Sequence, residues 1–162
     1  MAAGSTGRVE ARLAELGLSL PEVAAPLAAY VPAVTTGSYV YTSGQLPMVD
    51  GALAEAGVVG EGEGLVSVER AAELARICAL NALAAVKSQI GDLDRARVVK
   101  VVGFVASAPG FGGQPKVVNG ASELLGQVLG EHGVHARSAV GVAALPLNSP
   151  VEVELTVEVL AD

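Results

Sequence analysis

The sequence predicts an α+β fold in which two long helices cover one face of a mixed β-sheet. Apolar residues recur at helical spacing in Ser67–Ile90 and Val117–His132, which predicts the two helices. Runs rich in β-branched residues at Arg97–Ser107, Arg137–Ala144 and Val151–Val159 predict strands around them. Helices and strands in this order are typical of a layer of helices on one side of a sheet, so we expect the second sheet face to stay uncovered.

Composition and length narrow the class of protein. The 162 residues suit one domain, and a hydrophobic content of 51% excludes disorder. No run approaches the roughly 18 uncharged apolar residues of a membrane-spanning helix, so no membrane partner is expected. A net charge of −7 and an aromatic content of 3% disfavour nucleic acid as a partner.

The cysteine count and the first residues indicate a compartment. A single cysteine, Cys78, excludes a disulfide scaffold and fits a reducing environment. Residues Met1–Gly7 lack the basic and apolar regions of a signal peptide. We therefore expect a cytoplasmic protein.

The first third of the chain is expected to be an extension, a hairpin and a long loop. Residues 1–20 are read as an N-terminal extension with a short amphipathic helix over Arg8–Leu18, closed by Gly17. An extended Ala- and Pro-rich run, Pro21–Pro32, leads to a hairpin over residues 33–43 that turns at Gly37-Ser38. Residues 51–64 form a connection that is long for a compact domain, and we expect it to be mobile or functional.

The first long helix carries an alanine-rich stripe. The steps of four and three place Ala71, Ala75, Cys78, Ala82 and Val86 on one face, and Gly91 ends the helix. Small side chains bring the helix close to whatever it covers. Because Cys78 lies in this stripe, we expect a packing thiol rather than a nucleophile.

The last strand alternates strictly between apolar and polar side chains. Valine or leucine stands at every second position from Val151 to Val159, and Glu152, Glu154, Thr156 and Glu158 occupy the others. If this strand pairs with the preceding one through a turn at Pro146–Pro150, Arg137 lies far along from Glu152. Spacing alone then predicts a surface salt bridge for Arg137, although these side chains could still converge with a neighbouring subunit.

The two histidines and the glycine-rich segment Gly110–Lys116 do not form a recognisable metal- or phosphate-binding motif. His132 and His135 flank a helix end, where polar residues are favoured, and neither histidine nor cysteine spacing can build a metal site. The segment Gly110–Lys116 lacks the spacing of a phosphate-binding loop and is expected to be a surface loop. No metal and no cofactor are therefore expected.

Two motifs and a third segment carry a family resemblance. The pattern R-S-x-V-x-V-x-x-L-P at Arg137–Pro146 is followed by V-E-V-E at Val151–Glu154. The segment Tyr39–Pro47 reads Y-V-Y-T-S-G-Q-L-P, with Tyr30 thirteen residues before its serine. Together with a strand at residues 101–106 and Val118-Asn119, these resemble the Rid family of reactive enamine/imine deaminases, also called YjgF-like or endoribonuclease L-PSP proteins.

The resemblance implies a fold, an assembly and a reaction. The fold is chorismate-mutase-like (YjgF-like), and the assembly is a homotrimer whose sheets form an inner barrel, with clefts between subunits. The reaction is hydrolysis of 2-imino or 2-enamino acids to 2-keto acids and ammonia, so the implied ligand is a small carboxylate such as an imino or keto acid.

The resemblance also implies roles for particular residues. Arg137 matches the carboxylate-binding arginine, whose fork suits a carboxylate, and Glu152 resembles the group that positions water or transfers a proton. Tyr30 matches the tyrosine of the cleft, so Arg137, Glu152 and Tyr30 are the candidate catalytic residues. The remaining candidates for substrate binding are Ser43, Gly44, Ala139 and Asn119. Ala139 stands where the family has a cysteine, and Asn119 is one residue further from Arg137 than in the family pattern.

Three functions remain open. The first is an imine deaminase. The second is a non-catalytic or regulatory binder of small carboxylates, suggested by Ala139 and by the longer loops at residues 51–64 and Ala108–Pro115. The third is an endoribonuclease, against which the net charge of −7 argues.

Overall fold

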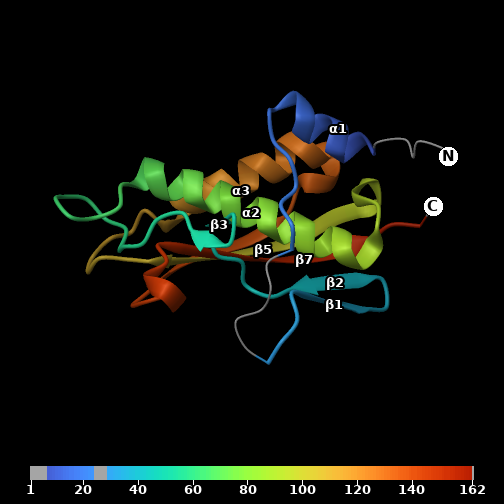
Figure 1. The fold of residues 1–162 in the computed structure, drawn as a ribbon. Helices are drawn as coiled ribbons and strands as arrows, with labels where there is room; N and C mark the ends of the chain where they lie inside the picture. Colours follow the sequence, from blue (N-terminus) through green and yellow to red (C-terminus); the bar gives the residue numbers. More distant parts are fainter. Residues whose placement is uncertain (1–6, 24–28, 162) are drawn as a thin grey trace.

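The computed structural model describes residues 7–23 and 29–161, which form a layer of helices over a five-stranded sheet (Figure 1). The sheet has the order β1-β2-β7-β5-β6. Its strands are β1 (Ala33–Thr36), β2 (Tyr39–Thr42), β5 (Ala96–Ala106), β6 (Ala136–Val142) and β7 (Val151–Val159). The expected α+β fold, with two long helices on one face of a mixed sheet, is confirmed.

The last strand, β7, lies in the middle of the sheet and pairs antiparallel with both β2 and β5. Strand β6 pairs parallel with the far side of β5, so β6 and β7 are not neighbours. The direct pairing through Pro146–Pro150 is therefore wrong. The physical reason is that a helix connects β5 to β6, and such a crossover returns the chain parallel to the strand it left.

The two long helices begin and end at residues with recognisable capping roles. Helix α2 (Val68–Ile90) starts after Ser67, whose Oγ accepts a hydrogen bond from the Arg70 backbone N–H at 3.1 Å. It ends at Gly91, whose φ is 76°. Helix α3 (Gln114–Leu129) begins three residues before the expected Val117, because Pro115 fits its first turn.

Short segments complete the helical layer. The 3₁₀ turns η1 (Leu93–Arg95), η2 (Gly130–Gly133) and η3 (Pro146–Asn148) lead into β5, β6 and β7. Helix α1 (Arg8–Glu15) buries Val9 and Leu13 and packs on α3. The Asp94 carboxylate accepts hydrogen bonds from the backbone N–H groups of Arg8 and Val9, both at 2.8 Å. The expected N-terminal helix is thus observed, with an end a few residues earlier than expected.

Parts of two expectations lie outside the described residues. Residues 1–6, which belong to the segment expected to lack a signal peptide, are not described. Residues 24–28, which belong to the run expected to be extended, are not described either.

The core lies between the helices and the sheet. Its large buried side chains are leucines and valines, among them Leu74, Leu83, Leu124, Leu125 and Leu155. Cys78 is fully buried, with its Sγ 3.8 Å from the carbonyl oxygen of Val151. Burial raises the pKa of this thiol well above its ordinary value, helped by the negative charge of Glu152. These contacts confirm the expectation that Cys78 packs in the core.

The long connection around residues 51–64 is not irregular throughout, because it shares a short hairpin and is hydrogen-bonded to the main sheet. Strands β3 (Met48–Val49) and β4 (Ala52–Leu53) form a small hairpin whose turn residues, Asp50 and Gly51, have φ of 50° and 80°. Further on, the backbone N–H of buried Val59 donates to the Ala106 carbonyl at 2.7 Å, so this segment is anchored to the end of β5.

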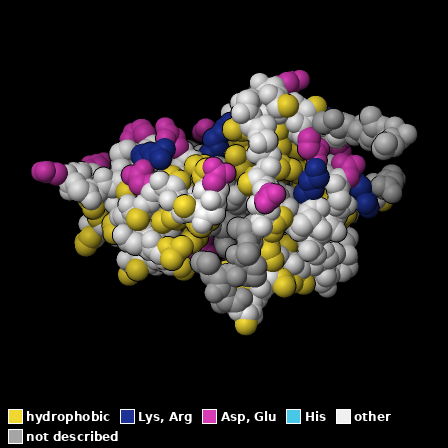
Figure 2. Space-filling model, viewed as in Figure 1, with side chains coloured by type: hydrophobic (Ala, Val, Ile, Leu, Met, Phe, Trp, Pro, Cys, Tyr) yellow, Lys and Arg dark blue, Asp and Glu magenta, His cyan; other side chains and the backbone are white. Residues whose placement is uncertain are grey.

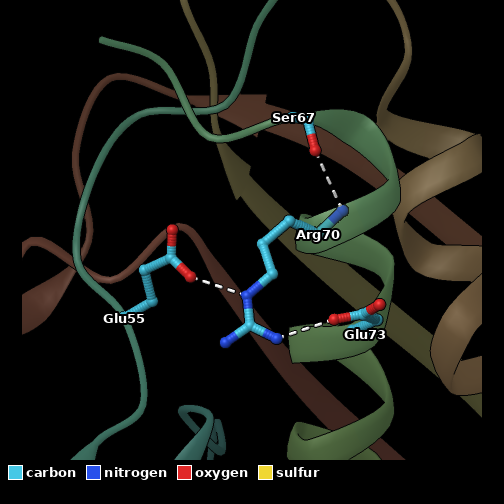
Figure 3. Close-up of polar contacts among 4 residues, drawn as sticks. All are labelled: Glu55, Ser67, Arg70 and Glu73. Carbon is cyan, nitrogen blue, oxygen red and sulfur yellow. Dashed lines mark hydrogen bonds and ion pairs between the residues drawn. The ribbon is translucent and has the colours of Figure 1, made fainter.

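A charged contact also ties this connection to the start of α2 (Figure 3). The Arg70 guanidinium donates from Nε to Glu55 at 2.6 Å and from Nη1 to Glu73 at 2.7 Å. These hydrogen bonds raise the pKa of Arg70, that to Glu55 most. All three side chains are partly exposed, so the contact orders the segment more than it stabilises the fold.

The sheet face opposite the helices carries apolar side chains that remain exposed. Val34, Tyr39, Tyr41 and Val140 are each more than a third exposed on it. In Figure 2 the charged side chains gather over the helical layer. Along the opposite edge of the view, on the side of the sheet, the coloured side chains are mainly hydrophobic. Within residues 7–23 and 29–161, no helix covers this face, as expected.

Candidate functional site

Arg137 lies near the start of β6 and points to the helical side of the sheet. It is paired in register with buried Val101 of β5, which faces the helices. Its guanidinium contacts three oxygens of α3. Nη1 donates to Asn119 Oδ1 at 2.8 Å and to Ser122 Oγ at 3.2 Å, and Nη2 donates to the Pro115 carbonyl at 3.3 Å. These contacts fix the guanidinium against one helix.

The charge of Arg137 is not neutralised by a neighbour. Its three acceptors are an amide, a hydroxyl and a carbonyl, and among residues 7–23 and 29–161 no carboxylate forms an ion pair with it. The expected surface salt bridge is therefore wrong, because β5 separates β6 from the acidic residues of β7. A half-buried cation held by neutral groups is suited to bind an anion.

The guanidinium also keeps hydrogen-bond donors for a ligand. An arginine side chain has five N–H donors, and Arg137 makes three contacts within the described part of the chain, none of them from Nε. A carboxylate can accept two parallel bonds from such a fork. We call Arg137, Asn119, Ser122 and the Pro115 carbonyl the arginine cluster.

Ala139 follows Arg137 by two positions and therefore points to the same side of β6. It is partly buried and packs against the hydrophobic core. Its methyl group offers neither a nucleophile nor a proton donor beside the arginine cluster.

Glu152 lies near the start of β7 and points to the open side of the sheet. It is in register with Phe104 of β5, while Val151 and Val153 on either side are buried beneath the helices. Burial raises the pKa of its carboxyl group, and repulsion from the Glu154 carboxylate adds to the effect. A carboxyl group with a raised pKa is better matched to proton transfer near neutral pH than an ordinary one.

The segment after β2 lies directly beside Glu152. Gln45 and Val153 exchange backbone hydrogen bonds of 2.8 and 3.0 Å, which hold Gly44 against the Glu152 side chain. A Cβ at Gly44 would overlap the Glu152 carboxylate. Only glycine therefore allows this approach.

Ser43 and Tyr30 adjoin the same segment. Ser43 Oγ donates to the Val31 carbonyl at 2.6 Å, and its backbone N–H donates to the Pro32 carbonyl at 2.8 Å. Tyr30 precedes this contact in the chain and is 48% exposed. We call Glu152, Gly44 and Ser43 the glutamate cluster, and Tyr30 is connected to it through Val31 and Pro32 of the chain.

The structure thus divides the expected site residues into two clusters on opposite sides of one sheet. Arg137 is opposite Val101 and Glu152 is opposite Phe104, three positions further along β5 and on the other face. Arg137, Asn119 and Ala139 come together at the edge strand, and Glu152, Gly44 and Ser43 lie near the middle. A single copy of the described chain does not bring Arg137 and Glu152 to the same pocket.

Sequence reasoning missed Ser122 and His135 as neighbours of Arg137. Ser122 Oγ lies 2.8 Å from His135 Nε2, and His135 Nδ1 lies 2.6 Å from the Gly133 carbonyl oxygen. The two-residue spacing of His135 and Arg137 was the available signal, because alternate residues of a strand share a face.

The described residues contain neither a metal-binding cluster nor a membrane-spanning helix. No group of three or more His, Cys, Asp or Glu side chains within them could hold a metal ion. No helix in this part of the chain is long and apolar enough to cross a bilayer.

Comparison with known proteins defines the class to which this fold and its two clusters belong. Residues 10–159 match the family described as "YjgF/chorismate_mutase-like, putative endoribonuclease". Protein TCP17 of Trypanosoma cruzi is 44% identical over 160 residues, which is 98% of each chain. The chain therefore belongs to the YjgF/chorismate mutase-like family.

Two solved structures are similar over nearly the whole chain. Atu1372 of Agrobacterium tumefaciens, a protein of unknown function, is 50% identical with a TM-score of 0.85, covering 93% of this chain and 92% of that one. A "putative endoribonuclease" of Shewanella oneidensis is 36% identical with a TM-score of 0.89, covering 94% of this chain and 100% of that one. They confirm the expected family and the YjgF-like fold.

Proposed function

We propose that this protein hydrolyses reactive 2-imino or 2-enamino acids to 2-keto acids and ammonia. The observation that carries the proposal is the Arg137 guanidinium, which is fixed by neutral acceptors and keeps N–H donors for a carboxylate. Membership of the YjgF/chorismate mutase-like family supports the assignment. The buried free thiol of Cys78 is consistent with a cytoplasmic location.

We infer that the reaction takes place between subunits of a homotrimer. The arginine and glutamate clusters lie on opposite sides of one sheet, so a complete site needs the arginine cluster of one copy and the glutamate cluster of the next. The exposed apolar side chains of the open sheet face support such an assembly, because a patch of this kind marks an interaction surface.

In the proposed mechanism, Arg137 binds the carboxylate of the imino acid and Glu152 of the neighbouring copy holds a water against the imine carbon. The Glu152 carboxylate takes a proton from this water as the water oxygen bonds to the imine carbon. The π electrons of the C=N bond move to nitrogen, and Glu152 passes the same proton to that nitrogen, which gives a carbinolamine. Proton transfer from the hydroxyl through Glu152 then converts the amino group into a leaving group. The C–N bond breaks, and ammonia and the 2-keto acid are released. The raised pKa of Glu152 suits it to both transfers.

The activity is tested with an imine generated in the assay by an amino-acid oxidase or a dehydratase. We expect the protein to accelerate release of ammonia and keto acid, and Arg137→Ala to lose most of the acceleration. Arg137→Lys keeps the charge but not the fork, so it should recover little activity. Equal rates for wild type and Arg137→Ala would contradict the mechanism.

The intersubunit site is tested by mixing two inactive variants. Arg137→Ala keeps the glutamate cluster and Glu152→Gln keeps the arginine cluster. If the variants are unfolded together and reassembled at equal amounts, about one quarter of the sites in a symmetric oligomer regain both intact clusters. We expect a corresponding partial recovery of activity. No recovery, with mixed oligomers shown by mass spectrometry, would contradict the intersubunit site.

A second candidate function is a non-catalytic binder of small carboxylates. It is favoured by Ala139, which places a methyl group beside the arginine cluster. In that case calorimetry would show binding of a short 2-keto acid such as pyruvate, while no imine hydrolysis would be measured. Failure of pyruvate to bind would count against both functions.

An endoribonuclease activity is the third candidate, because the family description and the Shewanella oneidensis protein carry that name. The net charge of −7 disfavours a polyanionic substrate. RNA cleavage by wild type that Arg137→Ala abolishes would favour this function. Cleavage that survives the substitution would indicate a contaminating nuclease.

A further inference from the structure

We propose that His135 is a positioning residue for Arg137 and acts through the Ser122 hydroxyl. The proposal rests on the proposed function, since it assigns Arg137 to carboxylate binding. His135 immediately precedes β6, and Ser122 lies in the middle of α3, so the two side chains bridge these elements. The ring therefore connects the strand that carries Arg137 to the helix that holds its guanidinium.

The direction of each hydrogen bond follows from the chemistry of the atoms. A carbonyl oxygen only accepts, so His135 Nδ1, 2.6 Å from the Gly133 oxygen, carries the hydrogen. In the neutral ring Nε2 is then an acceptor, and the Ser122 hydroxyl donates to it over 2.8 Å. With its hydrogen turned to the ring, Ser122 presents a lone pair to Arg137 Nη1, which donates to it over 3.2 Å.

The backbone around Gly133 fixes the far end of this chain of hydrogen bonds. A Cβ at Gly133 would overlap the backbone carbonyl of Leu125, so the 3₁₀ turn η2 passes directly against α3. The Gly133 carbonyl is thereby held in place relative to Ser122, and the ring spans the two. His135 thus fixes the rotation of the Ser122 hydroxyl. The direction of the Ser122 lone pair in turn orients Arg137 Nη1.

Two substitutions of similar polarity separate this role from general packing. In His135→Gln the side-chain amide reaches the former position of Nε2 and can accept from Ser122. In His135→Asn the shorter amide reaches the position of Nδ1 and cannot. We expect His135→Asn, which loses the acceptor for the Ser122 hydroxyl, to weaken pyruvate binding roughly tenfold. His135→Gln keeps that acceptor and gives up only the bond to the Gly133 carbonyl, so it should stay within about twofold of wild type.

Nuclear magnetic resonance tests the same chain without a ligand. Long-range ¹H–¹⁵N spectra at pH 8 should show His135 as the Nδ1–H tautomer, with His132→Gln used to assign the two rings. The Arg137 Nε–H signal should move in His135→Asn and Ser122→Ala and stay in place in His135→Gln. A His135 ring in the Nε2–H tautomer, or an Arg137 signal unchanged in all three variants, would overturn the proposal.

The two sets of measurements keep this inference apart from the proposed function. If wild type binds no pyruvate, the proposed function fails, and the ligand-free spectra still decide whether His135 orients Arg137. If wild type binds pyruvate and His135→Asn binds it equally well, the positioning role fails and the carboxylate site stands. Equal weakening in His135→Asn and His135→Gln, both with wild-type melting temperatures, would also overturn the role, because the acceptor at Nε2 would not matter.

Discussion

Gly44 and Glu152 show how one missing side chain can place a reactive group. A Cβ at Gly44 would overlap the Oε1, Cδ and Cγ atoms of Glu152, which are the flexible end of that side chain. A larger residue at position 44 would therefore displace the carboxylate without moving the backbone. Site geometry and fold stability can be separated at this position.

We predict that Gly44→Ala folds normally but loses activity. The displaced Glu152 carboxylate can no longer hold the attacking water, so kcat for imine hydrolysis should fall at least about tenfold, as expected for loss of a positioned acid–base group. The melting temperature should change little. Gly112→Ala is the matched control, because a Cβ there contacts nothing within 4 Å. A loss of kcat in both variants would contradict the explanation.

The raised pKa of Glu152 also predicts a pH dependence of stability. The folded state binds this proton more tightly than the unfolded state, because the pKa of Glu152 is raised above its ordinary value of 4.5. Ionisation therefore costs stability as pH rises from that value through the raised folded pKa.

We predict that Glu152→Gln melts at a higher temperature than wild type at pH 7, and that the excess over wild type disappears towards pH 4. Glu154→Gln should produce a smaller change in the same direction, because Glu154 is the second cause of the raised pKa. Thermal unfolding followed by circular dichroism between pH 4 and 8 measures both. An excess of Glu152→Gln over wild type that stays constant or shrinks as pH rises would contradict the prediction.

The packing of α2 on α3 depends on a close approach of their backbones. A Cβ at Gly120 of α3 would overlap the carbonyl oxygen and carbon of Ala72 in α2. Unlike the contact at Gly44, this one involves backbone atoms that cannot move aside. The alanine-rich stripe of α2 was a sign in the sequence that this helix lies close to its neighbour.

Gly120→Ala is predicted to lower the free energy of unfolding by about 2 kcal/mol or more, the cost of overpacking a close contact. Gly126→Ala, in the same helix and with nothing within 4 Å of the added Cβ, should instead raise it by about 0.5–1 kcal/mol through helix propensity. Urea unfolding of the two variants provides the comparison. Equal effects of both substitutions would show that α2 and α3 can separate at little cost.

Local patterns in the sequence predicted the helices and long strands well. They did not predict which strands pair with each other in the sheet. The alternation of Val151–Val159 and the stripe of Ser67–Ile90 were each correct within a residue or two. The parallel pairing of β6 with β5 was missed, because strand order depends on contacts far apart in sequence. The small β3–β4 hairpin was missed too, although Asp50-Gly51 is a typical type I′ turn pair.

The candidate site shows the same division. Family motifs identified Arg137, Glu152 and Asn119, and the structure places Asn119 against Arg137 despite its altered spacing. The motifs could not reveal that a whole sheet separates Arg137 from Glu152. They also could not reveal the bridge of Ser122 and His135, because neither residue belongs to a motif.

At the scale of the whole molecule, the open sheet face should govern assembly. Val140 is 44% exposed on this face and lies in register with Phe104, which in turn is opposite Glu152. A charge introduced there would be buried by any subunit that covers the sheet, and an unpaired buried charge is costly.

We predict that the wild-type protein has the mass of a trimer in light scattering and that Val140→Glu shifts it towards the monomer. Imine hydrolysis should be lost with the trimer. Val49→Glu is the control, because Val49 is similarly exposed but lies in the β3–β4 hairpin away from the main sheet. A monomeric wild type with full activity would refute the intersubunit site.

The central place of β7 sets the order in which the sheet can be completed during synthesis. The ribosome makes β1 and β2 early, but β2 has to wait more than a hundred residues for its partner β7. Because β7 also joins this hairpin to β5, the sheet stays in two separate parts until the last strand emerges. The nascent chain therefore exposes strand edges for most of its elongation, a period in which chaperones protect such edges from aggregation.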